Sequence, residues 1–94
     1  SNALLYEGIK PVFVDIDPDT FNMDVDEIEK KVTSKTKGIL LVHILGLPSE
    51  RQKFLRIIKK YKLQVIEDAC EAVGCPTKHF PIGTYGDISV YGFF

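Results

Sequence analysis

Alternating stretches of apolar and polar residues divide the chain into predicted strands and helices. Four short runs rich in apolar or β-branched residues predict strands, at residues 12–16, 38–44, 64–68 and 88–94. The run at 38–44 shows no alternation of apolar and polar positions. Such a run is typical of a strand that is buried on both faces of a parallel sheet.

The segment between the first two predicted strands has the spacing of a helix. Val25, Ile28 and Val32 recur at helical intervals, and either Asp24 or Asp26 can serve as the N-cap. Glu27 follows Asp24 by three residues, so the pair resembles a capping box. We therefore expect a helix that ends near Val32.

A second helix is predicted between the second and third strands. It would begin after Ser49 as its cap and end near Tyr61. Its predicted core-facing stripe consists of Phe54, Ile57, Ile58 and Tyr61. The tail of a helix at residues 4–8 and a short helical turn at residues 69–73 complete the expected order.

Strands alternating with helices at these spacings predict right-handed βαβ crossovers and one α/β domain. The expected fold is a mostly parallel sheet in a three-layer α/β/α arrangement. Ser1-Asn2-Ala3 is typical of an expression-tag remnant, so the predicted domain covers residues 4–94. The first predicted strand has only a helix tail before it and the last has no helix after it. We therefore expect a piece of a larger domain.

Composition excludes several classes of protein and of site. The formal net charge is −1 with both signs interspersed, which argues against a nucleic-acid partner. The longest apolar stretch, residues 39–47, is too short for a membrane span, and no signal-peptide pattern is present. Cys70 and Cys75 are too few for a disulfide framework, and no histidine pair near them indicates a metal site. A cytoplasmic protein without a metal is expected.

Three polar features are expected at the carboxyl ends of the predicted strands: His43, the Glu67-Asp68 pair and the segment at residues 83–87. In open parallel sheets, ligands bind outside the carboxyl ends of the strands, where loops and helix amino-termini converge. The sequence therefore predicts a ligand site at that edge of the sheet.

Residues 8–17, 36–43, 65–74 and 83–94 form four blocks that follow one another in a recognisable order and spacing. Together they resemble consecutive blocks of the DegT/DnrJ/EryC1/StrS family. This family comprises pyridoxal-phosphate (PLP)-dependent aminotransferases of the aspartate-aminotransferase fold (fold type I) that act on nucleotide sugars. The resemblance implies that residues 4–94 are part of a PLP-binding large domain. It also implies a homodimeric parent enzyme that transfers an amino group from glutamate to a keto sugar nucleotide, in polysaccharide or amino-sugar biosynthesis.

The same resemblance implies cofactor contacts for Asp68, Glu71 and His43. Asp68 matches the family's aspartate beside the pyridine nitrogen, where an anion favours the protonated ring that acts as an electron sink. The alternative is that Asp68 only caps the following turn. Glu71 lies one helical turn on, where the family often has glutamine or histidine, and it is otherwise a solvated residue. His43 is otherwise a buried histidine hydrogen-bonded to a loop.

The resemblance also predicts what this chain lacks. The family's Schiff-base lysine follows the block that ends at Phe94, and none of the lysines present matches that position. Gly92 stands where many members have a serine that contacts the cofactor phosphate. We therefore expect no catalytic residue in this chain, no transaminase activity and no PLP bound by the chain alone.

Two alternative functions remain at this point. In a related branch of the family the same fold carries out sugar dehydration, with histidine in place of the lysine. A small receiver-like binding module would use Asp68 as a phosphoacceptor, with Asp15 and Asp17 as its acidic pair. That module also needs a lysine after a late strand, and none follows residues 88–94.

Overall fold

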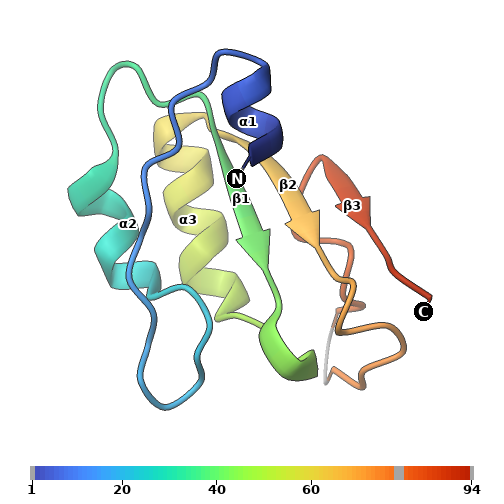
Figure 1. Cartoon of the computed structure of the whole chain (residues 1–94). Helices are drawn as coiled ribbons and strands as arrows, with labels where there is room; N and C mark the ends of the chain where they lie inside the picture. Colours follow the sequence, from blue (N-terminus) through green and yellow to red (C-terminus); the bar gives the residue numbers. More distant parts are fainter. Residues whose placement is uncertain (1, 78–79, 94) are drawn as a thin grey trace.

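The computed structural model describes residues 2–77 and 80–93 (Figure 1). Three strands form one sheet in the order β1 (Gly38–Val42), β2 (Gln64–Asp68) and β3 (Ile88–Val90). Both strand pairs are parallel, and β2 lies in the middle. The parallel α/β class predicted from the sequence is therefore confirmed.

The helices are α1 (Asn2–Tyr6), α2 (Val25–Lys31), the 3-10 turn η1 (Ile44–Gly46) and α3 (Arg51–Tyr61). Helices α2 and α3 contact each other and share one hydrophobic core with the sheet (Figure 1). The buried residues of this core are Val25, Ile28, Leu41, Phe54, Ile57, Val65 and Tyr85. Helix α1 has no buried residue. The described chain thus holds the sheet and one helical layer of the predicted three-layer arrangement.

Helix α2 begins where the sequence predicted. Asp24 is its N-cap, and the Asp24 carboxylate accepts a hydrogen bond from the backbone N–H of Asp26 at 2.8 Å. The capping box is not formed, because the Asp24 carboxylate binds the N–H of Asp26 rather than that of Glu27, and the Glu27 side chain pairs with Lys30 within the same helix.

Helix α3 keeps its predicted stripe but not its predicted cap. Phe54 and Ile57 are buried, and Ile58 and Tyr61 pack against the same core, as predicted. The prediction of Ser49 as N-cap was wrong, because Glu50 occupies that position without a side-chain hydrogen bond. Ser49 is instead buried just before the helix.

The prediction of a strand at residues 12–16 was also wrong. That segment makes only one isolated antiparallel bridge, between Ile16 and Met23. Val12 and Phe13 are exposed, with relative exposures of 60% and 74%. A β-branched run becomes a strand when it pairs with a neighbouring strand. Among the described residues this segment pairs only through that one bridge, although Val14 packs against the hydrophobic core.

Two further predictions need correction. The strand at 38–44 is not buried on both faces, because Leu40 and its neighbour Ile66 on β2 are 38% and 40% exposed. The described residues cover only one face of the sheet with helices. The segment 69–73 forms hydrogen-bonded turns rather than a helix, and β3 covers only part of the predicted run.

Candidate functional site

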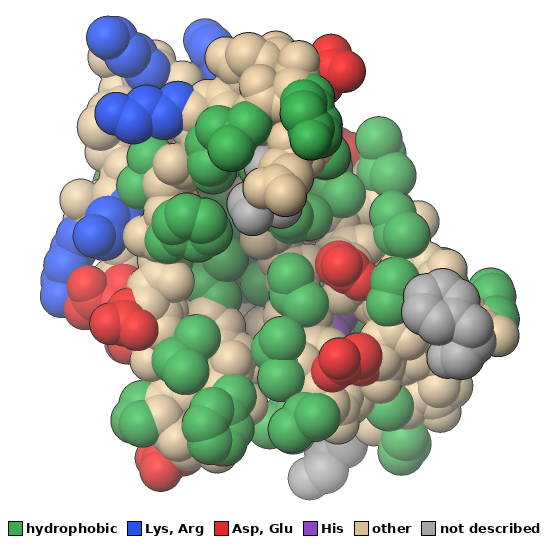
Figure 2. All heavy atoms as spheres, viewed as in Figure 1, with side chains coloured by type: hydrophobic (Ala, Val, Ile, Leu, Met, Phe, Trp, Pro, Cys, Tyr) green, Lys and Arg blue, Asp and Glu red, His purple; other side chains and the backbone are tan. Residues whose placement is uncertain are grey.

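The two faces of the sheet have different surroundings. Successive side chains of a strand point to opposite faces, so β2 sends Val65 and Glu67 to the helix-covered side and Ile66 and Asp68 to the other side. We call the second side the open face. Figure 2 shows hydrophobic side chains gathered over the strands with acidic side chains among them.

Asp68 ends β2 at the carboxyl edge of the sheet, in register with Val42 on β1 and Val90 on β3. Its side chain is half-buried, and its Oδ1 accepts a hydrogen bond from the backbone N–H of Cys70 at 3.1 Å. A carboxylate has about four acceptor positions, so this bond leaves acceptor capacity for a ligand. The same carboxylate, by hydrogen bonding to the Cys70 thiol, raises the pKa of that thiol, and burial raises it further.

Glu71 is exposed, and its carboxylate binds a neighbouring loop. Oε2 accepts a hydrogen bond from the backbone N–H of Leu45 at 2.8 Å. Leu45 lies in η1 with a left-handed φ of 52°, which is a strained conformation for a branched residue. Glu71 therefore ties the turn after β2 to the loop after β1. Its predicted contact with a cofactor stays a prediction.

His43 lies on the helix-covered side and is fully buried. Its Nε2 is 2.9 Å from Oε1 of Glu67, and its Nδ1 accepts a hydrogen bond from the backbone N–H of Ser49 at 3.3 Å. The alternative of a buried histidine hydrogen-bonded to a loop is therefore what the structure shows. Both ring nitrogens have protein partners, and a direct cofactor contact for His43 stays a prediction.

Glu67 was predicted only as part of the Glu67-Asp68 pair at a strand end, and no role of its own was predicted for it. It is fully buried and accepts hydrogen bonds from His43 and from the backbone N–H groups of Gly83 and Tyr85, the latter at 2.8 Å. The sequence signal was partial. Strand alternation places Glu67 on the same side as Val65, but only the structure shows that this side, with Leu41 in register with Glu67, is the core. A charged residue at such a core position indicates a built polar network.

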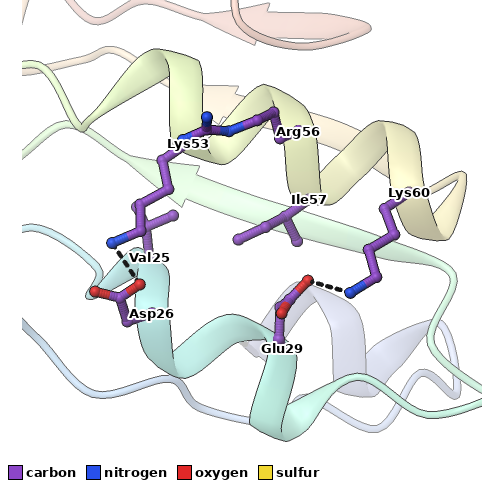
Figure 3. A pocket seen from close by; sticks show the side chains of 7 residues that line it. All are labelled: Val25, Asp26, Glu29, Lys53, Arg56, Ile57 and Lys60. Carbon is purple, nitrogen blue, oxygen red and sulfur yellow. Dashed lines mark hydrogen bonds and ion pairs between the residues drawn. The ribbon is translucent and has the colours of Figure 1, made fainter.

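A groove between α2 and α3 has a volume of about 210 Å³ but does not contain the predicted site (Figure 3). Two ion pairs span the helices beside it, Asp26 with Lys53 and Glu29 with Lys60. None of the predicted site residues lines this groove. Since its acidic groups are already paired, it offers little specific recognition to a ligand.

Other kinds of site find no support in the described part of the chain. Among residues 2–77 and 80–93, no group of three or more histidine, cysteine, aspartate or glutamate side chains is placed to hold a metal ion. No helix within these ranges is long and apolar enough to cross a membrane.

Comparison with known proteins identifies the group to which these features belong. The sequence pattern of the DegT/DnrJ/EryC1/StrS aminotransferase family matches residues 1–94. The chain belongs to this family. The family pattern thus covers the three strands, the two core helices and the carboxyl edge with Asp68.

Individual members of the DegT/DnrJ/EryC1/StrS family show the same similarity. The chain is 45% identical to the GDP-perosamine synthase of Escherichia coli O157:H7, over 99% of this chain and 26% of that protein. It is 37% identical to the dTDP-4-dehydro-2,6-dideoxy-D-glucose 3-dehydratase of Saccharopolyspora spinosa, over 99% of this chain and 20% of that protein. The chain thus spans about a quarter or less of the length of these relatives.

A solved structure of the family extends the comparison to three dimensions. The crystal structure of NtdA from Bacillus subtilis with bound cofactor PMP matches 94% of this chain and 19% of that protein. The TM-score is 0.82 and the sequence identity is 45%. The described residues are therefore a partial fold type I α/β domain, as the resemblance implied.

Proposed function

We propose that this chain forms the wall of a PLP site that holds the pyridine nitrogen of the cofactor, with Asp68 as the residue that contacts it. The whole protein would transfer an amino group from an amino-acid donor, glutamate, to a keto sugar nucleotide. The observation that carries the proposal is the place of Asp68 on the open face, between two valines at the carboxyl edge of a parallel sheet.

The surroundings of Asp68 fit a pyridine ring. Val42 and Val90 flank the carboxylate in register, so an aromatic ring placed there has apolar neighbours on both sides. The carboxylate has spare acceptor positions for a ring N–H. When bound, PLP supplies an electron sink, and an anion beside its ring nitrogen keeps the ring protonated.

The described lysines support the proposal that the Schiff-base lysine lies elsewhere in the protein. A lysine that forms a Schiff base needs a lowered pKa, so that the amine is free. Ion pairing instead raises the pKa of Lys30, Lys53 and Lys60, each through a hydrogen bond to a carboxylate of α2. Since none of the lysines in the sequence matches the family's Schiff-base position, we expect the 94-residue chain alone to have no transaminase activity.

The substitution Asp68→Asn in the full-length protein that contains this chain tests the assignment. Removing the charge beside the ring nitrogen should lower kcat by about a hundredfold or more, the range seen when one preorganised electrostatic group is lost. The absorbance spectrum of added PLP should change at the same time. Asp26→Asn is the matched control, because Asp26 is an exposed residue of α2 paired with Lys53.

Each outcome of this test has a clear meaning. Loss of activity and a changed PLP spectrum in Asp68→Asn, with neither in Asp26→Asn, supports the proposal. A wild-type rate and spectrum in Asp68→Asn overturns it.

The similarity to a sugar 3-dehydratase makes sugar dehydration a second candidate for the activity of the whole protein. Both reactions use PLP on a nucleotide sugar, and the Asp68 contact would serve either. Incubation of the full-length protein with a keto sugar nucleotide separates them, because transamination consumes glutamate and dehydration releases water from the sugar without consuming the donor's amino group. We further propose a cytoplasmic homodimer, in line with the family resemblance.

A further inference from the structure

Glu67 is a buried carboxylate that lies next to Asp68 in β2, and both of its oxygens are hydrogen-bonded. Glu67 has no exposed surface, although a buried carboxylate is costly unless every charge and lone pair is matched. Its two oxygens accept hydrogen bonds from the His43 ring and from the backbone N–H groups of Gly83 and Tyr85. The Ser89 hydroxyl lies 3.5 Å from Oε2 and donates to the Gly83 carbonyl at 2.7 Å.

The hydrogen bonds assign the protons of the pair. Ser49 donates its backbone N–H to Nδ1 of His43, so Nδ1 carries a lone pair and the proton resides on Nε2. Nε2–H then donates to Glu67, whose three partners are all donors. A carboxylate that only accepts is ionised. The pair is therefore a neutral histidine with a buried glutamate anion.

This anion connects three segments that meet at the carboxyl edge of the sheet. His43 follows β1, Glu67 belongs to β2, and Gly83 and Tyr85 precede β3. Gly83 has a φ of +90°, and a Cβ there would lie 1.5 Å from the Tyr91 hydroxyl, so only glycine can present this N–H to Glu67.

The end of β2 is also held by its backbone. The Asp68 carbonyl accepts from the N–H of His43 at 3.0 Å, and the N–H of Ala69 donates to the Val90 carbonyl at 2.9 Å. Glu67 and Asp68 share a peptide bond and point to opposite faces. A change in the network of Glu67 that shifts the backbone of β2 would therefore also shift the Asp68 side chain.

We infer that Glu67, held by His43, is a positioning residue for the reaction and acts through Asp68. The buried anion locks the three loops and the strand end so that the Asp68 carboxylate faces the ring nitrogen in one orientation. This inference rests on the proposed function, and it gives Glu67 and His43 a role without any contact to cofactor or substrate.

A double-mutant cycle in the full-length, PLP-loaded protein tests the inference. Glu67→Gln places an amide NH₂ against backbone donors, so the network must shift. A misplaced catalytic group costs up to about a hundredfold in rate, and we expect kcat of Glu67→Gln to fall by about tenfold to a hundredfold. In the Asp68→Asn background the same change should lower kcat no further, because the residue through which Glu67 acts is already lost.

Ile28→Val is the matched control. It removes one methyl group from the buried core and touches none of the hydrogen bonds of Glu67. It should lower the thermal midpoint and leave kcat and the PLP spectrum unchanged. If Glu67→Gln does not fold, Glu67→Asp replaces it, since that variant keeps the charge and withdraws the carboxylate by one methylene group.

The outcomes separate this inference from the proposed function. A fall in kcat for the Glu67 variant that disappears in the Asp68→Asn background supports the inference. A lowered midpoint with wild-type kcat, or equal losses in both backgrounds, overturns it and leaves the proposed function intact. If Asp68→Asn itself behaves as wild type, the proposed function fails, and the positioning role fails with it.

Discussion

Glu67 and Asp68 are consecutive carboxylates at the end of β2, yet they lie in opposite surroundings. Glu67 points to the helix-covered side, where it is fully buried and every described partner donates to it. Asp68 points to the open face and is half-buried, and its partners are the backbone N–H and the thiol of Cys70. Two residues of one chemical type thus have different consequences, because a strand turns neighbouring side chains to opposite faces.

Two residues joined by one peptide bond therefore differ in what they contribute: Glu67 stabilises the fold, and Asp68 is available to bind a ligand. A buried anion with all its donors matched stabilises one arrangement of the surrounding loops, and its loss leaves several polar groups unpaired. A half-exposed carboxylate with spare acceptor positions contributes little to folding and is available to a ligand. Such a pair can hold a site in place with one residue and contact the ligand with the next.

The largest expected effect compares the two residues directly. In the cofactor-free full-length protein, Glu67→Ala should lower the free energy of unfolding by about 3–5 kcal/mol, the usual cost of removing one partner from a buried charged network. Asp68→Ala should lower it by only about 1 kcal/mol, since one hydrogen bond is lost. Urea denaturation followed by circular dichroism measures both. Equal losses for the two variants would contradict the comparison.

A smaller expected effect is the pH dependence of stability that Tyr85 causes. Its ring packs against His43, with ring centroids 4.9 Å apart. Burial raises the pKa of the Tyr85 hydroxyl above its ordinary value of 10.0, Arg51 opposes the shift and Glu67 adds to it. Because the folded-state pKa is the higher one, this stabilisation is complete below pH 10 and is lost as the pH rises through the folded-state pKa.

The stability of the wild-type protein should therefore fall more steeply above pH 10 than that of Tyr85→Phe, which has no group to titrate at this position. Thermal midpoints measured for both proteins from pH 8 to about pH 11 provide the test. Parallel curves would show that Tyr85 is not desolvated in the folded state.

The smallest expected effect is a change in the reactivity of the Cys70 thiol, which depends on the charge of Asp68 on the open face. The Asp68 carboxylate raises the pKa of the Cys70 thiol, first through a hydrogen bond, so less thiolate is present near neutral pH. Asp68→Asn should therefore speed the alkylation of Cys70 by iodoacetamide at pH 8. The measurement uses a Cys75→Ser background, so that Cys70 is the residue followed. Unchanged alkylation rates would place the Asp68 charge away from the thiol.

Several elements could be predicted from sequence because their signals are local. The bounds of β2 follow from a short run with two β-branched residues that ends at a turn, and the start and apolar spacing of α2 follow from the aspartates near its beginning and from Val25 and Ile28. The carboxyl edge as the place of Asp68 follows from parallel topology alone. The family resemblance added the chemistry, which periodicity does not specify.

Other features could not be predicted, because they depend on what lies next to a residue in space. The run at 12–16 has the composition of a strand but makes only one isolated bridge, between Ile16 and Met23. Ser49 has the right type for a helix cap, yet its N–H binds His43, and the helix begins one residue later. The network of Glu67 joins residues that are 16 to 24 positions apart, and no local pattern links them.

The sequence by itself determined a parallel α/β unit, its family and the strand end that carries Asp68, because strand parity, helix spacing and motif order are properties of neighbouring residues. Only the tertiary structure decided which of the two carboxylates is buried in a network and which faces outward with spare acceptor positions. That choice depends on where the helices pack and which backbone N–H groups the loops present, and these are set by contacts between residues distant in the chain.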